Sequence, residues 1–325
     1  MKSLALSRDA LLGYALAAIV FVVYLRFPAF ASPASLLGVF NDTSILLILA
    51  LGQMMVILTR CIDLSMASNL ALVGMASAMV NASAPGIPIP LLILMAILAG
   101  AALGSINGLL VWKLDIPPIV VTLGTLTIFR GIIFLISDGQ WVNAHEMSDT
   151  FKSLPRSFFL GLSLLSWCAI AVIGIVALII NLTATGRAFY AVGGNPNAAV
   201  YTGIDVGRTR FKAFVLAGAL AGLAGYLWVS RYAVAYVDVA GGFELDVVAA
   251  CVIGGISIAG GMGTVTGAVL GALFLGVIKN ALPVVDISPF WQQAISGSAI
   301  IIAVTLNART ERRPGRIILK QAEKL

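Results

Sequence analysis

Few residues of this sequence could carry covalent or metal chemistry. The single histidine, His145, stands beside Glu146 in a polar stretch, with no second histidine to complete a metal-ligand pair. The cysteines, Cys61, Cys168 and Cys251, are far apart and match no metal spacing. The sequence contains no Gly-x-x-x-x-Gly-Lys-Ser/Thr phosphate loop and no serine nucleophile elbow. We therefore expect no catalytic residue, no metal and no cofactor, and no ATP hydrolysis by this chain alone.

A second group of candidates consists of polar residues inside long apolar stretches. Such residues are costly in a membrane and often mark a functional site. We assign a translocation path to the side chains of Gln53, Asn69, Asn107, Thr122, Thr125 and Arg130. Asn, Gln and Thr donate and accept hydrogen bonds, as hydroxyl groups do, so the set suits a neutral, hydroxylated substrate. The alternative interpretation is that these side chains only bond one helix to another.

The elements that must position these residues are membrane helices. Hydrophobic residues make up 60% of the 325 residues and charged residues only 10%, whereas soluble domains have about 25% charged residues. Residues 64–112 and 247–278 lack Asp, Glu, Lys and Arg altogether, and one membrane span needs about 20 apolar residues. Composition excludes a soluble enzyme, a disordered chain and a secreted disulfide scaffold. It predicts an all-α polytopic membrane protein.

We predict about ten transmembrane helices within one domain, residues 1–325. The predicted spans are 10–26, 43–60, 65–82, 89–112, 116–137, 159–182, 211–231, 245–260, 262–281 and 287–307. Glycines break the stretch 245–281, which could hold two short helices or one helix and a re-entrant segment. Fourteen Lys and Arg residues fall at one set of span ends and five at the other. This asymmetry places both termini in the cytoplasm.

Three segments outside the spans have a distinctive composition. They are a polar outer loop at 138–158, an inner loop at 183–210 and a basic cytoplasmic tail at 308–325. In the inner loop, Asn195 or Asn197 can cap a short helix over 197–201, and Gly203 can end it. A simple connector does not need so much defined turn chemistry. We interpret the inner loop as a docking element.

Glycines and acidic residues indicate how the bundle packs and where its energy comes from. Glycines recur every four residues at Gly100, Gly104 and Gly108, at Gly218 and Gly222, and at Gly263, Gly267 and Gly271. This spacing predicts close helix packing, or alternatively a path lined by backbone. The acidic residues Asp63, Asp115, Glu244 and Asp246 all fall at span ends. A carrier driven by an ion gradient usually needs a buried acid, so we expect the energy to come from another subunit.

The sequence resembles the permease subunits of bacterial carbohydrate ABC importers, the group that carries ribose, xylose, arabinose, rhamnose and autoinducer-2. Four stretches carry the resemblance: the coupling-loop pattern at 183–204, Ile-Asp-Leu-Ser at 62–65, the Pro-Pro stretch at 117–131 and the glycine-rich segment at 254–271. Two departures surround the second stretch. Arg60-Cys61 replaces the family's usual Gly-Gly, and Met66-Ala67 replaces Val-Gly. The Arg60-Cys61 variant is most similar to rhamnose-type permeases.

The resemblance implies a type II ABC importer-like fold in the bacterial inner membrane, surrounded by lipid, with no nucleic-acid partner. It implies a homo- or heterodimer of permeases, cytoplasmic ABC ATPase subunits and a periplasmic sugar-binding protein. Coupling to the ATPase would fall on Gly186, Arg187, Gly193, Asn195, Asn197, Ala198, Tyr201 and Gly203.

The expected cargo is a monosaccharide such as rhamnose or a pentose. Autoinducer-2, a branched-chain amino acid or a nucleoside are alternatives within the same role. An ion-coupled secondary transporter is a different class of function, and it would require uptake that survives vanadate and stops with an uncoupler. A membrane enzyme is disfavoured because acid, base and nucleophile sets are missing from the sequence.

The path assignment predicts that Asn107→Leu and Thr125→Leu reduce uptake, because each removes hydrogen-bonding groups from the proposed path. Membrane insertion should be unchanged. Uptake and membrane abundance are measured together in cells. Normal uptake by both variants would exclude the assignment.

Overall fold

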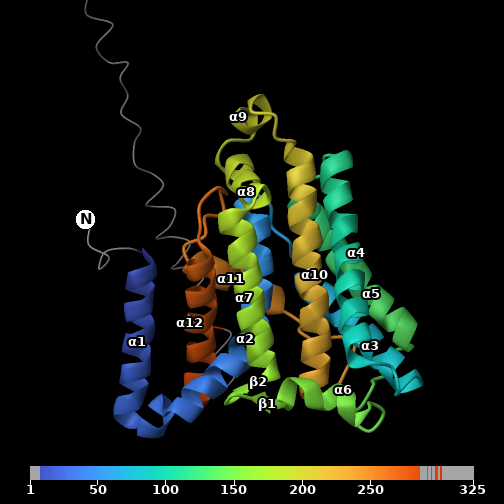
Figure 1. Ribbon diagram of the computed structural model, residues 1–325, viewed down its shortest axis with the longest axis vertical. Helices are drawn as coiled ribbons and strands as arrows, with labels where there is room; N and C mark the ends of the chain where they lie inside the picture. Colours follow the sequence, from blue (N-terminus) through green and yellow to red (C-terminus); the bar gives the residue numbers. More distant parts are fainter. Residues whose placement is uncertain (1–7, 286–290, 292–293, 295–296, 299–300, 302–325) are drawn as a thin grey trace, which may run out of the picture.

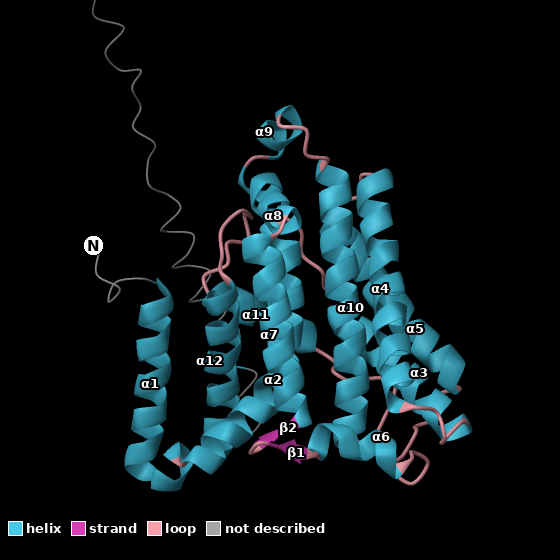
Figure 2. Ribbon diagram, in the orientation of Figure 1, coloured by secondary structure: helices cyan, strands magenta, loops and turns pink. Residues whose placement is uncertain are grey.

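The structure is a computed structural model that describes residues 8–285 together with 291, 294, 297, 298 and 301. The regular secondary structure of this part of the chain is helical apart from one small hairpin, and loops connect the elements (Figures 1 and 2). The long helices are α1 (Arg8–Arg26), α2 (Pro33–Leu58), α3 (Met66–Ser83), α4 (Ile89–Lys113), α5 (Pro118–Ser137), α7 (Leu164–Leu182), α10 (Val206–Tyr232) and α12 (Val265–Val284). The short elements are η2 (Pro28–Ala31), α6 (Asp149–Ser153), η3 (Leu154–Arg156), α8 (Ala184–Gly194), α9 (Pro196–Tyr201), α11 (Phe243–Ile253), and the antiparallel strands β1 (Phe158–Phe159) and β2 (Leu162–Ser163).

The helices run up and down between two ends of the molecule (Figure 1). We call the upper end in Figure 1 the α9 end; it holds α8, α9 and the loops 59–65 and 254–264. The lower end is the α6 end, with α6, the hairpin and the loop 233–242. Within the described residues, seven helices are long and apolar enough to cross a membrane. The predicted polytopic α-helical class is therefore confirmed.

The predicted spans before residue 245 each correspond to a helix, but α2 begins at Pro33, ten residues before the predicted start at 43, and the glycine-rich region differs further. The span predicted at 245–260 is wrong as a continuous helix: α11 has 11 residues, about 16 Å of helix, and a non-helical loop follows it. Gly255, Gly260 and Gly261 adopt positive φ in this loop, a conformation that ends a helix. The span predicted at 262–281 corresponds to α12. Most of the span predicted at 287–307, and the tail 308–325, lie outside the described residues.

Helices α2 and α10 form the centre of the bundle. The second half of α2 is buried on every side, from Ile45 to Leu58, which explains why this segment is apolar all round. It packs against α7, α10, α11 and α12, and α10 also packs against α3 and α4. Ser32 caps α2 and Asp205 caps α10, each accepting a backbone N–H three residues later.

Glycines allow α4 and α10 to touch backbone to backbone, as their spacing predicts. A Cβ on Gly100 would overlap the Gly218 carbonyl oxygen and lie 2.6 Å from the Gly222 Cα. A Cβ on Gly104 would overlap the Phe214 carbonyl oxygen. Such approach maximises van der Waals contact between helices in a membrane, where helices gain little from leaving lipid. Close helix packing is confirmed at these positions.

This contact predicts that Gly104→Ala destabilises the protein by about 1–3 kcal/mol, the usual cost of overpacking. Gly174→Ala on α7 is the matched control, because a Cβ there meets nothing within 4 Å. The control should be neutral or slightly stabilising, since alanine favours helix. Denaturant unfolding in detergent measures both variants. Equal stability of the two would contradict the backbone contact between α4 and α10.

Candidate coupling site and buried polar cluster

The inner loop folds into two short helices, α8 and α9, through local capping. The Thr183 hydroxyl accepts the Gly186 N–H at 3.2 Å at the start of α8. The Asn195 side chain accepts the Ala198 N–H at 3.1 Å at the start of α9, where Pro196 occupies the first turn. Gly203 follows α9 with φ of +81°, the left-handed conformation typical of a residue after a helix. Asn195 and Gly203 therefore act as the sequence predicts.

The tip of α9 presents apolar and polar side chains to the outside. Tyr201 is 92% exposed and Val200 is 59% exposed, and Asn197 and Ala198 are also exposed. Ala199 is buried beneath them. The helix is therefore a small rigid knob whose exposed aromatic and aliphatic groups have no partner within the described protein, which is typical of a docking surface.

Three distant segments meet beneath α9 at what we call the glycine junction: Leu58–Arg60 after α2, Gly193–Gly194 at the end of α8, and Gly260–Gly261 in the loop before α12. The Gly261 N–H donates to the Leu58 carbonyl at 3.0 Å. A Cβ on Gly193 would overlap that same carbonyl and the Gly261 nitrogen. The backbones are therefore in direct contact, and only glycine fits at Gly193.

Arg60 fastens the glycine junction. Its Nε donates to the Gly193 carbonyl at 2.6 Å and a terminal nitrogen donates to the Gly194 carbonyl at 2.8 Å. These carbonyls close α8, so the guanidinium satisfies groups that a helix end leaves open. The hydroxyl of Tyr190 adds a bond of 2.8 Å to the Gly263 carbonyl, and burial raises the pKa of this phenol. Together these contacts join α8 rigidly to α2 and to the loop 254–264.

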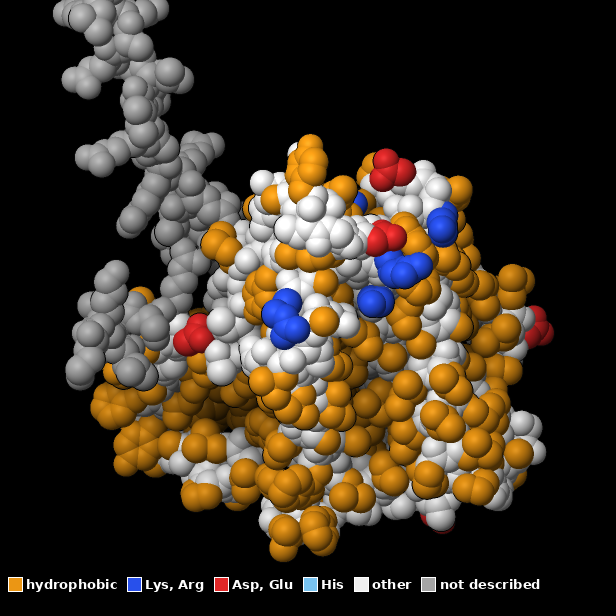
Figure 3. All heavy atoms as spheres, turned by 45° about the horizontal axis from the view of Figure 1, so that its top comes forward, with side chains coloured by type: hydrophobic (Ala, Val, Ile, Leu, Met, Phe, Trp, Pro, Cys, Tyr) orange, Lys and Arg blue, Asp and Glu red, His pale blue; other side chains and the backbone are white. Residues whose placement is uncertain are grey.

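A groove with basic walls lies beside α8. It encloses about 560 Å³ between α8 and the first turns of α10, and it is lined by Arg187, Arg208 and Lys212 together with Asp205. Figure 3 shows Lys and Arg side chains gathered toward the α9 end, whereas hydrophobic side chains cover the flanks. The exposed face of the inner loop thus combines an apolar knob with a groove of net positive charge.

A buried polar cluster surrounds the loop between α2 and α3. The Asp63 carboxylate is 3% exposed and accepts from the Ser65 N–H at 2.9 Å and the Ser65 hydroxyl at 2.6 Å. The Asn107 amide on α4 donates to the Ser65 hydroxyl at 2.7 Å. Burial raises the pKa of Asp63, and the bonds from Ser65 oppose that shift. With its side-chain amide flipped, Gln53 donates to the Asp63 backbone carbonyl at 3.1 Å and accepts from the Asp63 backbone N–H at 3.2 Å.

The structure brings three of the six residues predicted for the path to this cluster. Gln53 and Asn107 bond within it, and the Thr122 hydroxyl donates to the Ile62 carbonyl at 3.3 Å. The Asn69 amide on α3 donates to the Gly100 carbonyl at 3.2 Å. The Thr125 hydroxyl donates to the Val121 carbonyl, one turn earlier in α5. All five neutral side chains are buried inside this protomer. Four of them bond separate segments to one another, whereas Thr125 bonds only within α5, and the role of all five in a path stays a prediction.

Arg130 lies apart from the cluster, toward the α6 end. Its guanidinium donates to the carbonyls of Val237 at 2.8 Å and Val239 at 2.6 Å, and Asp238 is 4.0 Å away. The charge therefore holds the loop 233–242 against α5. Within residues 8–285 and the five others described, no group of His, Cys, Asp and Glu side chains could hold a metal ion.

Sequence reasoning missed several residues of this site. Arg60 and Asp63 read as ordinary charges at the ends of spans, and Ser65 as part of a motif. One signal was available: a short polar run interrupts an otherwise apolar region, and intramembrane polar groups need partners. The partners could not be read from the sequence, because Asn107 lies 42 residues from Ser65 and Gly193 lies 133 residues from Arg60.

Comparisons with known proteins give consistent matches. Residues 35–304 match a family described as "Branched-chain amino acid transport system / permease component". The chain is 38% identical over 309 residues to the autoinducer 2 import system permease protein LsrC of Enterobacter sp. (strain 638), covering 95% of this chain and 89% of that protein. It is 37% identical to LsrC of Klebsiella pneumoniae over 97% of this chain and 91% of that protein. No solved structure gives a significant match.

The glycine junction predicts that one of two adjacent substitutions disturbs the protein and the other does not. Gly193→Ala should separate α8 from α2, expose the segment 195–205 to protease and lower the melting temperature, by an amount equivalent to about 1–3 kcal/mol. Gly194→Ala should change neither, because a Cβ there meets nothing within 4 Å. Limited proteolysis and thermal unfolding of the purified chain measure both variants. Equal behaviour of the two would mean that the junction does not hold α8.

Proposed function

Since this chain belongs to the permease family described as the permease component of branched-chain amino acid transport systems, we propose that it carries a small hydroxylated cargo in an import reaction powered by a separate ATPase. It is a multi-pass permease of an ABC importer in the bacterial inner membrane. The observation that carries the proposal is the rigid, exposed knob of α9 on the glycine junction. Such an element can receive force from a partner and pass it to α2 and α12.

The proposed cargo is autoinducer-2 or a related small sugar. The proposal is supported by relatives named as autoinducer 2 import permeases, which share 37–38% identity with this chain. Rhamnose or a pentose is the alternative within the same class of cargo. A branched-chain amino acid fits less well: its path should offer partners for both charges, and Arg130 already bonds backbone carbonyls.

We place the α9 end in the cytoplasm. This end carries Arg60, Lys113, Arg187, Arg208, Arg210 and Lys212 at the ends of helices, and basic residues accumulate on the cytoplasmic side of membrane proteins. The α6 end, with the loop 138–158, then faces the periplasm, where a sugar-binding protein would dock. Ten spans with both termini inside are the arrangement that this orientation favours.

We assign ATPase docking to the inner loop in two parts. Gly186, Gly193, Asn195 and Gly203 shape it, and Arg187, Asn197, Ala198 and Tyr201 present exposed groups. A second permease, a copy of this chain or a paralogue, would complete the path. In that dimer Gln53, Asn69, Asn107, Thr122, Thr125 and Arg130 are proposed to act on the path by fixing the helices that form it.

The docking assignment predicts that Tyr201→Ala and Asn195→Ala lose a copurifying ATPase subunit. Exposed tyrosines at the centre of an interface often contribute about 2 kcal/mol or more, so the bound ATPase should fall more than tenfold. Tyr14→Ala is the matched control, because Tyr14 is also exposed, at 62%, but lies on α1. Mild-detergent purification with mass spectrometry gives the readout. A wild-type chain that purifies alone would overturn the importer proposal.

The proposed energy source predicts a specific inhibitor pattern. Uptake of autoinducer-2 is measured in ATP-replete membrane vesicles that contain the complete importer. It should stop with vanadate, which blocks ATPase turnover, and it should continue in the presence of an uncoupler. The opposite pattern would favour an ion-coupled transporter, the alternative class of function.

A further inference from the structure

A small pocket near the α6 end has the chemistry of a sugar site. It encloses about 160 Å³ between α2, α10, α11 and α12. Its main side chains are Asp42, Trp228, Tyr232, Phe243, Lys279 and Asn280. The volume is well below the ~300–1,000 Å³ of sites for drug-sized ligands. A ligand held here must therefore be small.

Aromatic rings form one wall of the pocket. Trp228 packs edge-to-face on Phe243 with centroids 5.1 Å apart, and its ring lies 5.3 Å from that of Tyr232. The three rings hold one another in place, so the wall is preorganised. Aromatic faces accept the C–H groups on the apolar face of a sugar ring. An aromatic wall facing polar groups therefore suits a molecule with one apolar face and a rim of hydroxyl groups.

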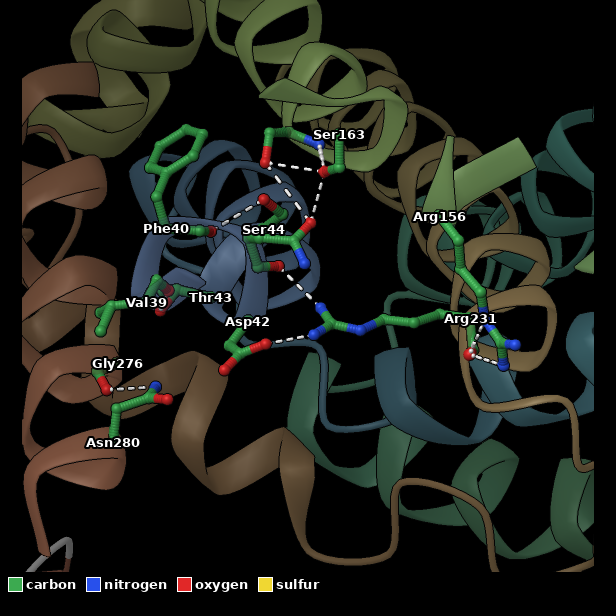
Figure 4. Close-up of polar contacts among 12 residues, drawn as sticks. Val39, Phe40, Asp42, Thr43, Ser44, Arg156, Ser163, Arg231, Gly276 and Asn280 are labelled. Atoms are coloured by element: carbon green, nitrogen blue, oxygen red, sulfur yellow. Dashed lines mark hydrogen bonds and ion pairs between the residues drawn. The ribbon is translucent and has the colours of Figure 1, made fainter. Parts of the chain in front are cut away.

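Other side chains of the pocket offer hydrogen-bonding groups that the described residues leave open. The Asn280 amide nitrogen donates to the Gly276 carbonyl at 2.9 Å, but its amide oxygen has no partner among residues 8–285. Asp42 uses one carboxylate oxygen for Arg231, and its other oxygen has no partner in the described part of the chain. Figure 4 shows Asp42 and Asn280 projecting into the space between α2 and α12, with Arg231 reaching Asp42 from α10. Both of these oxygens are acceptors, and the second N–H of the Asn280 amide is an unused donor, so the pocket offers both kinds of group that hydroxyl recognition requires.

The charges of the pocket cancel in pairs. Asp42 pairs with Arg231, and Lys279 pairs with Asp246. No net charge remains to attract an ion, so the pocket favours a neutral ligand over an amino acid or a phosphate. The floor is fixed by the contact between α2 and α12, because a Cβ on Gly276 would overlap Thr43. The pocket thus keeps its shape as a neutral, hydrogen-bonding site.

The pocket also borders a route from the α6 end. A wide groove of about 660 Å³ lies on that end, lined by Asp149, Lys152 and Arg156 among others. Tyr232 lines both this groove and the pocket. Tyr232, whose hydroxyl has no hydrogen-bond partner among the described residues, is thus shared by the outer groove and the inner pocket.

We propose that this pocket is a holding site for a small, neutral, polyhydroxylated ligand after its delivery at the α6 end. The inference rests on the proposed function, because it assigns a site to the same class of cargo. It predicts a site within one protomer, distinct from the buried cluster around Asp63.

Cysteine protection tests the site directly in right-side-out membrane vesicles that contain the complete importer. Asn280→Cys is made in a Cys168→Ser background, since Cys61 and Cys251 are buried. A membrane-impermeant thiol reagent should label position 280, and autoinducer-2 or L-rhamnose should slow the labelling at least about tenfold at saturation. L-leucine should give no protection. His145→Cys, on the exposed loop, is the control that should label equally with every probe.

Uptake gives the second measurement. Asn280→Leu and Trp228→Leu should raise the half-saturating concentration of the transported probe about tenfold, the effect of one hydrogen bond or ring contact. Trp167→Leu is the matched control: Trp167 is half-buried, also lies near the α6 end, and packs against Phe159 outside the pocket. The amount of ATPase subunit that copurifies with each variant measures assembly, and this separates a binding defect from misassembly.

The outcomes separate the two proposals. If the wild-type importer takes up a probe, but no probe protects the Asn280→Cys variant from labelling and Asn280→Leu transports normally, the pocket assignment is wrong and the proposed function stands. If an assembled wild-type importer takes up neither autoinducer-2 nor L-rhamnose, the proposed cargo falls, and the pocket assignment falls with it. Protection by L-leucine would also overturn the neutral-ligand assignment.

Discussion

Direct contact between backbones is the constraint on which the rest of this structure depends. In lipid, helices gain little from hiding apolar side chains, so they must gain from close packing. Glycine makes that possible between α4 and α10, where Gly100 and Gly104 face Gly218, Gly222 and the Phe214 carbonyl. The same device joins α11 to α12 through Gly254, Gly267 and Gly271. Because each pair of backbones is already in contact, a movement of one helix must move its neighbour.

The glycine junction extends this rigidity out of the bundle. Gly193 lies against Leu58 and Gly261, and Arg60 holds the two carbonyls that close α8. The exposed knob of α9 is therefore attached through α8 to two elements of the core, the end of α2 and the loop 254–264. Displacement of the knob by a partner would reach α2 and the loop 254–264 without an intervening flexible linker. The connection between α8 and the bundle is therefore small. It consists of glycine contacts between backbones and the hydrogen bonds of Arg60.

Polar groups inside the bundle are handled in two different ways. Around Asp63, the Ser65 and Asn107 side chains bond to one another and Gln53 bonds the Asp63 backbone, so the donors of the cluster are paired within it, while the Asn107 amide oxygen is buried without a partner among the described residues. Near the α6 end, Asn280, Asp42 and Tyr232 keep hydrogen-bonding capacity open toward a small cavity. The bonds around Asp63 stabilise the arrangement of α2, α3 and α4, whereas the open groups beside the aromatic rings recognise a ligand. Burial of a polar residue therefore does not by itself distinguish a path from a helix contact.

Features that depend on local pattern could be read from the sequence. Long uncharged stretches defined the membrane helices, glycines four residues apart marked the packing faces, and Asn195 and Gly203 marked the ends of α9. Features that depend on contacts across the chain emerged only from the folded arrangement. The structure shows that 254–264 is a loop, in which Gly260 and Gly261 adopt positive φ where they meet α8. The folded structure also brings Arg60 to Gly193, and it links Asp63 to Asn107 through the Ser65 hydroxyl. It places Asp42 across from Asn280. Periodicity records which face of a helix is buried; it carries no information about which distant residue that face will meet.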